Sequence, residues 1–272
     1  MKIPVFPNLG NTCYLSSVLQ SLLNSRGFNQ NIKDLDTPLS QELAKISSIT
    51  DTALDNKFLA VLYNISDLLH ILPFRRLEQQ DAHECILHIL DKLTPDPDSP
   101  FYKIFHGKTE TCIHCLKCGT TKKVLEDFNS INLNIPVEKS NIVELFQGYL
   151  ELETMTEDLY CCETCQGLQA YQKKTSLNIL PQVLIVVLKR YTFTGSKIVS
   201  EVQFGDTLNV REQSTGQVFN YTLRSVINHF GNLFNGHYSS FVKQNMWLYV
   251  DDECVQPRTP VIDNAYILFY EK

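Results

Sequence analysis

The hydrophobic and polar positions of the first third of the chain predict helices. Apolar residues within 15–23 recur three and four positions apart, which is the spacing of one face of an amphipathic helix. Turn-forming residues precede this run, and Asn11 or Thr12 is able to cap the helix. Beyond it, the sequence predicts polar turns at 29–38 and a further apolar-periodic stretch at 58–63.

The pattern changes after about residue 101, where strands replace helices. Before that point, 77–93 predicts a second long helix with a separate polar face, and 94–100 reads as a loop. The later chain contains a helical patch at 142–150 among segments with strand character. These segments are 127–137, 178–193, 237–243 and 246–252. Helices followed by mostly antiparallel strands predict an α+β fold.

Composition and charge narrow the class of protein. A chain of 272 residues with 43% apolar and 20% charged residues is folded, as one large domain or two small ones. Its net charge of −6 argues against nucleic acid or an anionic membrane as partner and favours a basic substrate. The first residues lack the apolar core of a signal peptide, and no apolar run reaches the length of a membrane span. We therefore expect a protein of the cytoplasm or the nucleus.

The nine cysteines are clustered, which in a reducing compartment indicates metal binding or catalysis rather than disulfides. Two Cys-x-x-Cys pairs, separated by 43 residues, comprise Cys115, Cys118, Cys162 and Cys165. Four thiolates in two such pairs match the ligands of a tetrahedral structural zinc that joins two hairpins. The spacing leaves the register open, because Cys112 also forms Cys-x-x-Cys with Cys115 and Cys161 neighbours Cys162. The pairs could also lie on strand tips without a metal.

Cys13 stands where the turn gives way to the first helix, and two interpretations of it are open. It is either a buried structural cysteine or a nucleophile, whose thiol pKa the helix N-terminus lowers. A nucleophile needs a base and a group that orients the base. If the hairpin 237–252 turns at Gln244, paired residues sum to about 488, which places His237 opposite Asp251 within one position. A half-exposed surface ion pair is the alternative interpretation of these two residues.

The order of cysteine, histidine and aspartate resembles that of papain-like cysteine proteases, and several motifs make the resemblance more specific. They are Asn8-Leu-Gly-Asn-Thr-Cys13-Tyr, Glu78-Gln-Gln-Asp-Ala-His-Glu84, the two cysteine pairs, Leu180-Pro-Gln-Val-Leu-Ile-Val-Val-Leu-Lys-Arg-Tyr191 and Gly236-His-Tyr238. Together they resemble the signature blocks of the ubiquitin-specific proteases, in that family's order and over nearly the whole chain. The resemblance implies one compact catalytic domain, 1–272, with a papain-like α+β fold. Its approximate parts are a helical thumb (1–108), zinc-bearing β fingers with part of the palm (109–175) and a β-sheet palm (176–272).

The resemblance also assigns roles to the candidate residues. It implies that Cys13 is the nucleophile, His237 the base and Asp251 its orienter. Asp252 occupies a second acidic position, which assists Asp251 or substitutes for it. Asn8 is a hydrogen-bond donor to the oxyanion. The family's Cys-x-x-Cys-Gly pattern assigns a structural zinc to the four cysteines of the two pairs.

The implied activity is that of a thiol-dependent deubiquitinase. Such an enzyme hydrolyses the bond after the C-terminal glycine of ubiquitin through a thioester. Asp81 and Glu84 would hold the arginine-rich ubiquitin tail, and Tyr238 and His229 would line or brace its channel. We expect a monomer whose partners are ubiquitin and ubiquitinated proteins. The alternatives are a protease for another ubiquitin-like modifier, a ubiquitin-binding pseudoenzyme and a zinc-ribbon interaction module.

Overall fold

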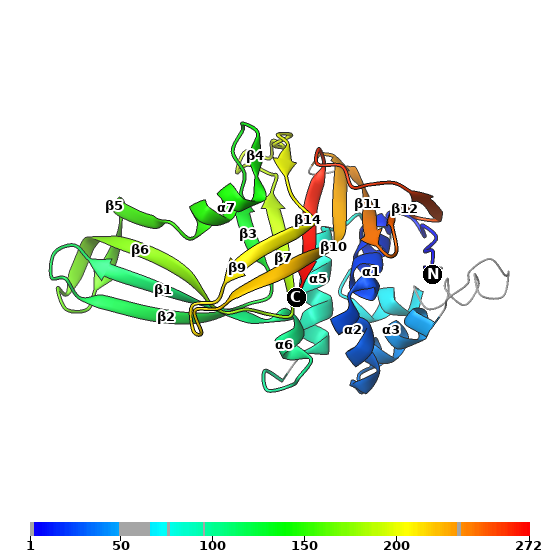
Figure 1. Cartoon of the computed structure of the whole chain (residues 1–272), viewed down its shortest axis with the longest axis horizontal. Helices are drawn as coiled ribbons and strands as arrows, with labels where there is room; N and C mark the ends of the chain where they lie inside the picture. Colours follow the sequence, from blue (N-terminus) through cyan, green and yellow to red (C-terminus); the bar gives the residue numbers. More distant parts are fainter. Residues whose placement is uncertain (1–2, 49–65, 75–76, 95, 233–234) are drawn as a thin grey trace.

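The computed structural model has most of its helices at one end, a large sheet in the middle and a long, narrow sheet that projects from the other end, with one short helix on the opposite side of the large sheet (Figure 1). It describes residues 3–48, 66–74, 77–94, 96–232 and 235–272. The helical elements are α1 (Cys13–Asn24), α2 (Arg26–Asn31), the 3₁₀ turn η1 (Ile32–Asp34), α3 (Pro38–Ser48), α5 (Ala82–Leu93), α6 (Tyr102–Phe105) and α7 (Ile142–Tyr149). The α+β class is therefore confirmed, while the predicted stretch 58–63 lies outside the described residues.

Helix α1 matches the prediction for 15–23 but is buried on all sides rather than on one face. Every residue from Cys13 to Leu23 is buried, including the polar ones. These polar groups find partners nearby: Ser21 donates its hydroxyl to the Ser17 carbonyl at 3.0 Å, and the Gln20 amide donates to the Pro4 carbonyl at 2.5 Å. The helix is therefore the central element of the helical end, where buried polar groups are tolerated because they are hydrogen-bonded.

Two predictions about the helical third are wrong in detail. The region 29–38 is not all turn, because α2 and η1 occupy its first part and bury Phe28 and Ile32, four positions apart, in the core. The second long helix begins at Ala82 rather than at 77. Its start is fixed by Asp81, whose carboxylate accepts hydrogen bonds from the backbone of the first turn.

The large sheet runs in the order β13-β12-β11-β10-β14-β7-β3, and β9 pairs with β10. Its pairs are antiparallel except for β3 with β7. The strands are β3 (Ile131–Asn134), β7 (Val183–Lys189), β9 (Thr207–Arg211), β10 (Val218–Gly231), β11 (Gly236–Lys243), β12 (Trp247–Asp251), β13 (Cys254–Pro257) and β14 (Ala265–Glu271). The short strands β4 (Ser140–Asn141) and β8 (Val202–Gln203) form a separate parallel pair.

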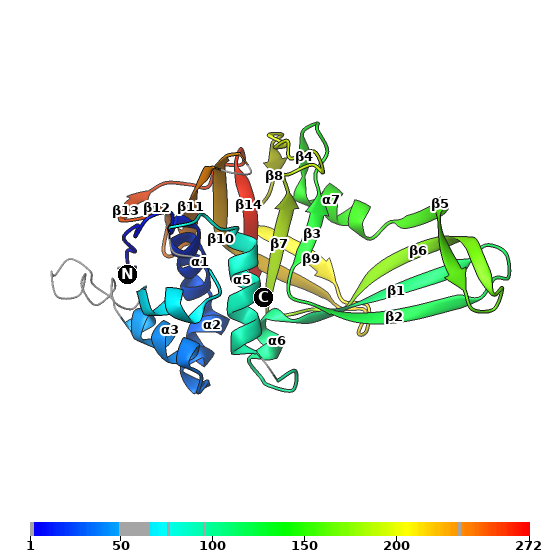
Figure 2. The ribbon, with the colours of Figure 1, turned by 180° about the vertical axis from the view of Figure 1, so that it is seen from behind.

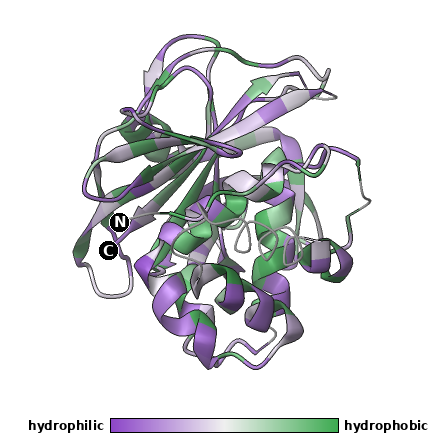
Figure 3. Ribbon diagram, turned by 90° about the vertical axis from the view of Figure 1, so that its right-hand side faces the viewer, coloured by the Kyte–Doolittle hydropathy of each residue, from purple (hydrophilic) through white to green (hydrophobic). Residues whose placement is uncertain are grey.

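Both faces of this sheet are covered, which explains the continuous apolar run in β7. Alternate residues of the strand belong to different cores: Ile185 packs with α1 and α5, and Val186 packs with α7. A strand buried on both faces reads as an unbroken hydrophobic segment. In Figure 3 the hydrophobic parts of the ribbon gather where the helices meet the sheet, and hydrophilic parts lie toward the periphery.

The narrow sheet has the order β2-β1-β6-β5 and extends away from the helices (Figure 2). Its strands are β1 (Gly107–Cys115), β2 (Thr121–Phe128), β5 (Leu152–Cys162) and β6 (Gly167–Ile179). The two cysteine pairs lie at the β1–β2 and β5–β6 turns, so they belong to separate hairpins as predicted. Among the residues that the structure describes, no helix combines the length and the apolar character needed to cross a membrane.

The burial of α1 gives a test of which contacts stabilise the fold. We expect Leu19→Ala, at a fully buried position of α1, to lower the free energy of unfolding by about 2–5 kcal/mol because it leaves a cavity between helices and sheet. Urea denaturation followed by circular dichroism measures the change. The control Leu168→Ala, on an exposed position of β6, should change it by less than about 0.5 kcal/mol. Equal effects of the two substitutions would contradict this account of the core.

Candidate active site

Cys13 is the first residue of α1 and is only 3% exposed. Thr12 is the N-cap residue, but its side chain makes no capping hydrogen bond, which corrects the expectation that Asn11 or Thr12 caps the helix. Asn8 fixes the turn instead, because its Oδ1 accepts hydrogen bonds from the backbone N–H of Gly10 at 3.0 Å and of Thr12 at 3.2 Å. The chain before the thiol is therefore organised by one side chain five residues upstream.

His237 and Asp251 meet, although the predicted strand register is wrong by two. Strands β11 and β12 pair so that residue numbers sum to 490, as for Phe241 with Tyr249. The turn therefore centres on Asn245, and His237 lies diagonal to Asp251 rather than opposite it. Both side chains still share one face of the sheet, since the shift is even. His237 Nε2 lies 2.5 Å from Asp251 Oδ1.

The imidazole of His237 lies between a thiol and a carboxylate. Its pKa is raised to about 9, chiefly by a hydrogen bond with Cys13; burial opposes this shift, and Asp251 adds to it. Because Nε2 faces Asp251, the other ring nitrogen, Nδ1, is the one left for the sulfur. Tyr249 donates its hydroxyl to Asp251 Oδ2 at 3.0 Å and so fixes the carboxylate. The arrangement is that of a nucleophile, a base and an orienting group.

Asp252 lies beside this group and holds Asn8. Its backbone has φ +48°, a left-handed conformation that aspartate tolerates better than most residues, in the tight turn between β12 and β13. Asn8 Nδ2 donates to Asp252 Oδ2 at 3.0 Å, and burial raises the pKa of Asp252. The Cys13 N–H opens α1 and has no partner within the helix. The predicted oxyanion donors are thus brought to the same end of α1 as the thiol.

The two acidic residues predicted to hold a substrate tail have different surroundings. Asp81 is half-buried, and its Oδ1 accepts from the backbone N–H of His83 at 2.7 Å and of Glu84 at 3.0 Å. Its Oδ2 accepts from the hydroxyls of Tyr266 at 2.8 Å and Tyr238 at 3.5 Å. Burial raises the pKa of both tyrosines, so they remain donors. Glu84 is exposed, with a longer 3.7 Å ion-pair contact to His88.

His229 lies on β10, directly opposite Tyr238 of β11, the strand that carries His237. It is buried, its Nδ1 is 2.8 Å from the Tyr191 hydroxyl, and its ring packs 4.5 Å from that of Tyr238. Burial, with Lys197 nearby, lowers its pKa to about 4, so the ring is neutral at physiological pH. A Cβ added to Gly236 would lie 2.2 Å from His229 Nε2. His229 and Tyr238 therefore brace the start of β11 from inside, and only glycine fits at 236.

Gln79 is a site residue that the sequence analysis did not single out. Its Nε2 donates to the Gly236 carbonyl at 2.6 Å, and its Oε1 accepts from the Gly236 N–H at 3.0 Å. This paired contact ties the segment before α5 to the residue next to His237. Gln79 lies within the motif 78–84 that carried the family resemblance, and this motif is the sequence signal that could have identified it. Tyr249 and Tyr266 were also missed, and no local pattern marks them.

The four predicted metal-ligating cysteines converge at the tip of the narrow sheet. Cys115 Sγ lies 3.9 Å from Cys165 Sγ, Cys118 Sγ lies 3.7 Å from Cys162 Sγ, and all four sulfurs lie within 4.8 Å of one another. Tetrahedral zinc with bonds of about 2.3 Å requires sulfur separations of about 3.8 Å. The residues therefore fit such an ion. Cys112 and Cys161 are outside the cluster, which resolves the register.

A thiol at the start of a central helix, with its imidazole and carboxylate on an adjacent sheet, is the arrangement of the papain-like cysteine proteases. Comparison with known proteins makes the assignment narrower. The family described as ubiquitin carboxyl-terminal hydrolase matches residues 6–270, and the chain belongs to this family.

Individual relatives match nearly the whole chain in sequence at low identity. The chain is 29% identical to mouse ubiquitin carboxyl-terminal hydrolase 17-like protein E, over 97% of this chain and 54% of that protein. It is 28% identical to ubiquitin carboxyl-terminal hydrolase 4 of Arabidopsis thaliana, over 98% of this chain and 92% of that one. The chain thus spans about half the length of the mouse relative.

A similar fold occurs in solved structures of the SAGA DUB module. In the complex of Ubp8, Sgf11, Sus1 and Sgf73 bound to monoubiquitin, the matching chain is 25% identical with a TM-score of 0.82. The match covers 99% of this chain and 69% of that one.

The charge state of His237 gives a test of the site. We expect its pKa to be near 9 in the wild type and to fall toward the ordinary value of about 6.5 in Cys13→Ala, because the hydrogen bond with the thiol is the largest cause of the shift. Side-chain NMR titration measures it. Since the folded pKa is raised, protonated His237 stabilises the fold below about pH 6.5, and this contribution is lost as the pH rises through about 9. The same pKa in both proteins would show that the thiol does not contact the ring.

Proposed function

We propose that the chain is a thiol-dependent deubiquitinase that hydrolyses the isopeptide or peptide bond after the C-terminal glycine of ubiquitin. The observation that carries the proposal is the position of His237, in hydrogen-bond reach of Cys13 on one side and of Asp251 on the other. Membership of the ubiquitin carboxyl-terminal hydrolase family supports the substrate class, and the monoubiquitin-bound structure of a similar fold supports it further.

Catalysis begins with the Cys13 thiol and the His237 imidazole. Because the pKa of His237 is raised to about 9, its ring already holds the thiol proton on Nδ1 at neutral pH, and the Cys13 thiolate attacks the carbonyl carbon of the terminal glycine. The carbonyl oxygen becomes an oxyanion, which the Asn8 amide and the Cys13 N–H stabilise. Loss of one such donor typically costs about 3 kcal/mol of barrier. Asn8 is suited to this role because Asp252 and the turn backbone fix its orientation before substrate arrives.

The second half of the reaction uses the same imidazole. Protonated His237 gives its proton to the lysine amine as the bond breaks, which leaves a thioester on Cys13. Water then attacks the thioester as His237 removes its proton, and the thiol is regenerated. Asp251 keeps the ring orientation and stabilises its protonated form, which agrees with the raised pKa. Asp252 assists through Asn8, and its carboxylate, within 4.8 Å of the ring, also adds negative charge beside His237.

The ubiquitin tail would pass along the start of α5 and β11. Glu84 offers an exposed carboxylate for an arginine of the tail. Asp81 adds negative charge while it orients Tyr238 and Tyr266, so its contribution combines attraction with support of the channel wall. His229 braces the same wall from the core.

The cysteine cluster would hold one structural zinc and takes no part in hydrolysis. The four thiolates fill its coordination positions, so the ion has no site for substrate or water. Its chemistry there is to join the β1–β2 and β5–β6 turns. We keep the division into thumb (1–108), fingers with part of the palm (109–175) and palm (176–272) as part of this proposal. We also propose a monomer of the cytoplasm or nucleus, without nucleic-acid or membrane partners.

Covalent capture tests the nucleophile and the modifier together. We expect ubiquitin with a C-terminal electrophile to label the wild type and not Cys13→Ala. The turnover of Cys13→Ala should fall by more than about a thousandfold, because Cys13 is the thiol that is hydrogen-bonded to His237. Intact-mass analysis measures the labelling. The control Cys254→Ser removes an exposed cysteine on β13 and should react as the wild type does.

Other outcomes of this experiment separate the alternatives. Labelling by another ubiquitin-like modifier instead of ubiquitin would keep the mechanism and change the substrate. A folded wild type that no probe labels would favour a ubiquitin-binding pseudoenzyme. Undiminished labelling of Cys13→Ala would exclude Cys13 as the nucleophile.

Metal content tests the cysteine cluster. We expect one zinc per chain, lost in Cys118→Ser, with a drop in Tm of more than about 5 °C because the two turns are no longer joined. Native mass spectrometry and thermal unfolding measure these quantities. Cys161→Ser is the matched control: it is exposed, adjacent to Cys162 and outside the cluster, so it should keep the metal and the Tm. A metal-free wild type of full stability would refute the site.

A further inference from the structure

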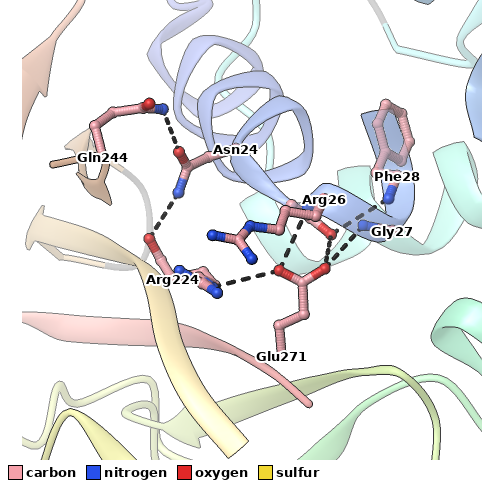
Figure 4. Close-up of polar contacts among 8 residues, drawn as sticks. Asn24, Arg26, Gly27, Phe28, Arg224, Gln244 and Glu271 are labelled. Carbon is pink, nitrogen blue, oxygen red and sulfur yellow. Dashed lines mark hydrogen bonds and ion pairs between the residues drawn. The ribbon is translucent and has the colours of Figure 1, made fainter. Parts of the chain in front are cut away.

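A polar cavity lies at the end of α1 opposite to Cys13. It has a volume of about 330 Å³ and is bounded by the ends of α1 and α2, by β10 and by the turn between β11 and β12. Asn24, Arg26, Arg224 and Gln244, which line it, are drawn in Figure 4. Cys13 and Asn24 are the first and last of the twelve residues of α1, and a helical rise of 1.5 Å per residue separates the cavity from the thiol by about 16 Å. The cavity is therefore distinct from the catalytic site.

The charge of this cavity is opposite to that of the chain. Its lining includes Arg26, Arg224 and Lys243, and none of the described lining residues is acidic, although the chain carries a net charge of −6. Lys243 is paired at its edge with Asp206 at 2.7 Å, and Arg224 lies 3.4 Å from Glu271. Among the described residues, the guanidinium of Arg26 has no hydrogen-bond or ion-pair partner, and in Figure 4 it points into the space between Asn24 and Arg224.

The wall of the cavity is fixed before any ligand arrives. Glu271, whose side chain is only 4% exposed, accepts from the Gly27 N–H at 2.8 Å and neutralises Arg224 from behind. Asn24 Nδ2 donates to the Arg224 carbonyl at 2.8 Å, while its Oδ1 accepts from Gln244 Nε2 at 2.6 Å (Figure 4). These contacts join α1, β10 and the β11–β12 turn. Arg26 is thus an uncompensated cation beside a polar wall that the protein's own hydrogen bonds already hold in place.

We propose that this cavity binds the phosphoryl group of a small phosphorylated ligand. A phosphate dianion has three acceptor oxygens, which suits the forked donors of Arg26 and Arg224 and the ammonium of Lys243. The exposed amide of Asn245 supplies a further donor from the turn. These donors come from different elements and so surround a tetrahedral anion better than a planar carboxylate. The volume matches the lower end of small-ligand sites, which admits one phosphoryl group and a part of its ester.

Titration calorimetry with sodium pyrophosphate as the probe, at constant low ionic strength in chloride, tests the site. The wild type should bind in a saturable manner at one site, and Arg26→Gln should weaken binding by about tenfold or more through loss of two charge-assisted hydrogen bonds. Arg26→Lys keeps the positive charge but lacks the paired N–H donors of the guanidinium, so its affinity should lie between those of the wild type and Arg26→Gln. The control Arg211→Gln removes an exposed arginine on β9 that faces Val218, at the far end of β10, and should bind as the wild type does.

Two further measurements complete the experiment. Arg26→Gln should be labelled by the ubiquitin electrophile at the wild-type rate, which shows that it is folded and that this site is independent of the proposed activity. A phosphoserine peptide that binds more tightly than pyrophosphate and loses affinity in Arg26→Gln would assign the phosphoryl group to a phosphorylated protein instead of a small molecule. Absence of saturable binding by both probes, or equal binding by the wild type and Arg26→Gln, would overturn the proposal.

Discussion

The packing of α1 between the large sheet and the other helices is the constraint on which the rest of the structure depends. A helix that is buried on all sides has no freedom to shift without opening a cavity or exposing apolar surface. Its first residue, Cys13, therefore occupies one place relative to β11, and its last, Asn24, occupies one place relative to β10. One packing arrangement thus fixes a thiol at one end of the helix and a polar cavity at the other.

His237 is brought to Cys13 by short turns and paired contacts. The β11–β12 turn sets which face of the sheet His237 and Asp251 share, and the next turn, at Asp252, directs a second carboxylate toward Asn8. Gln79 then ties the beginning of β11 to the segment before α5. Each contact is modest in free energy, but together they leave the site little freedom of geometry. Preorganisation of this kind is what an oxyanion site and a general base require.

The narrow sheet solves a different physical problem. It extends away from both hydrophobic cores, so its far end cannot be stabilised by apolar burial. The four convergent cysteines lie at that end, and the zinc that we propose there would replace a core as the source of stability. The molecule therefore combines a well-packed end that carries Cys13 and His237 with a projecting arm whose tip carries the four cysteines. This division agrees with a protein substrate large enough to contact both the packed end and the narrow sheet.

The sequence by itself determined the central helix, the buried strand β7 and the α+β class, which rest on a local periodicity that the chain carries without reference to distant residues. Spacing alone left the role of Cys13 and the register of the cysteine pairs open, and the motifs of the family resemblance supplied both expectations. Only the tertiary structure decided the true register of His237 and Asp251, the start of α5 at Asp81 and the clamp formed by Gln79. Turn geometry sets the register, and the competition of side chains for backbone groups sets the start of α5, neither of which the hydrophobic pattern reveals. The Gln79 clamp depends on a contact between residues 157 positions apart. The same reason hides the cavity at Arg26, whose walls come from opposite ends of the chain.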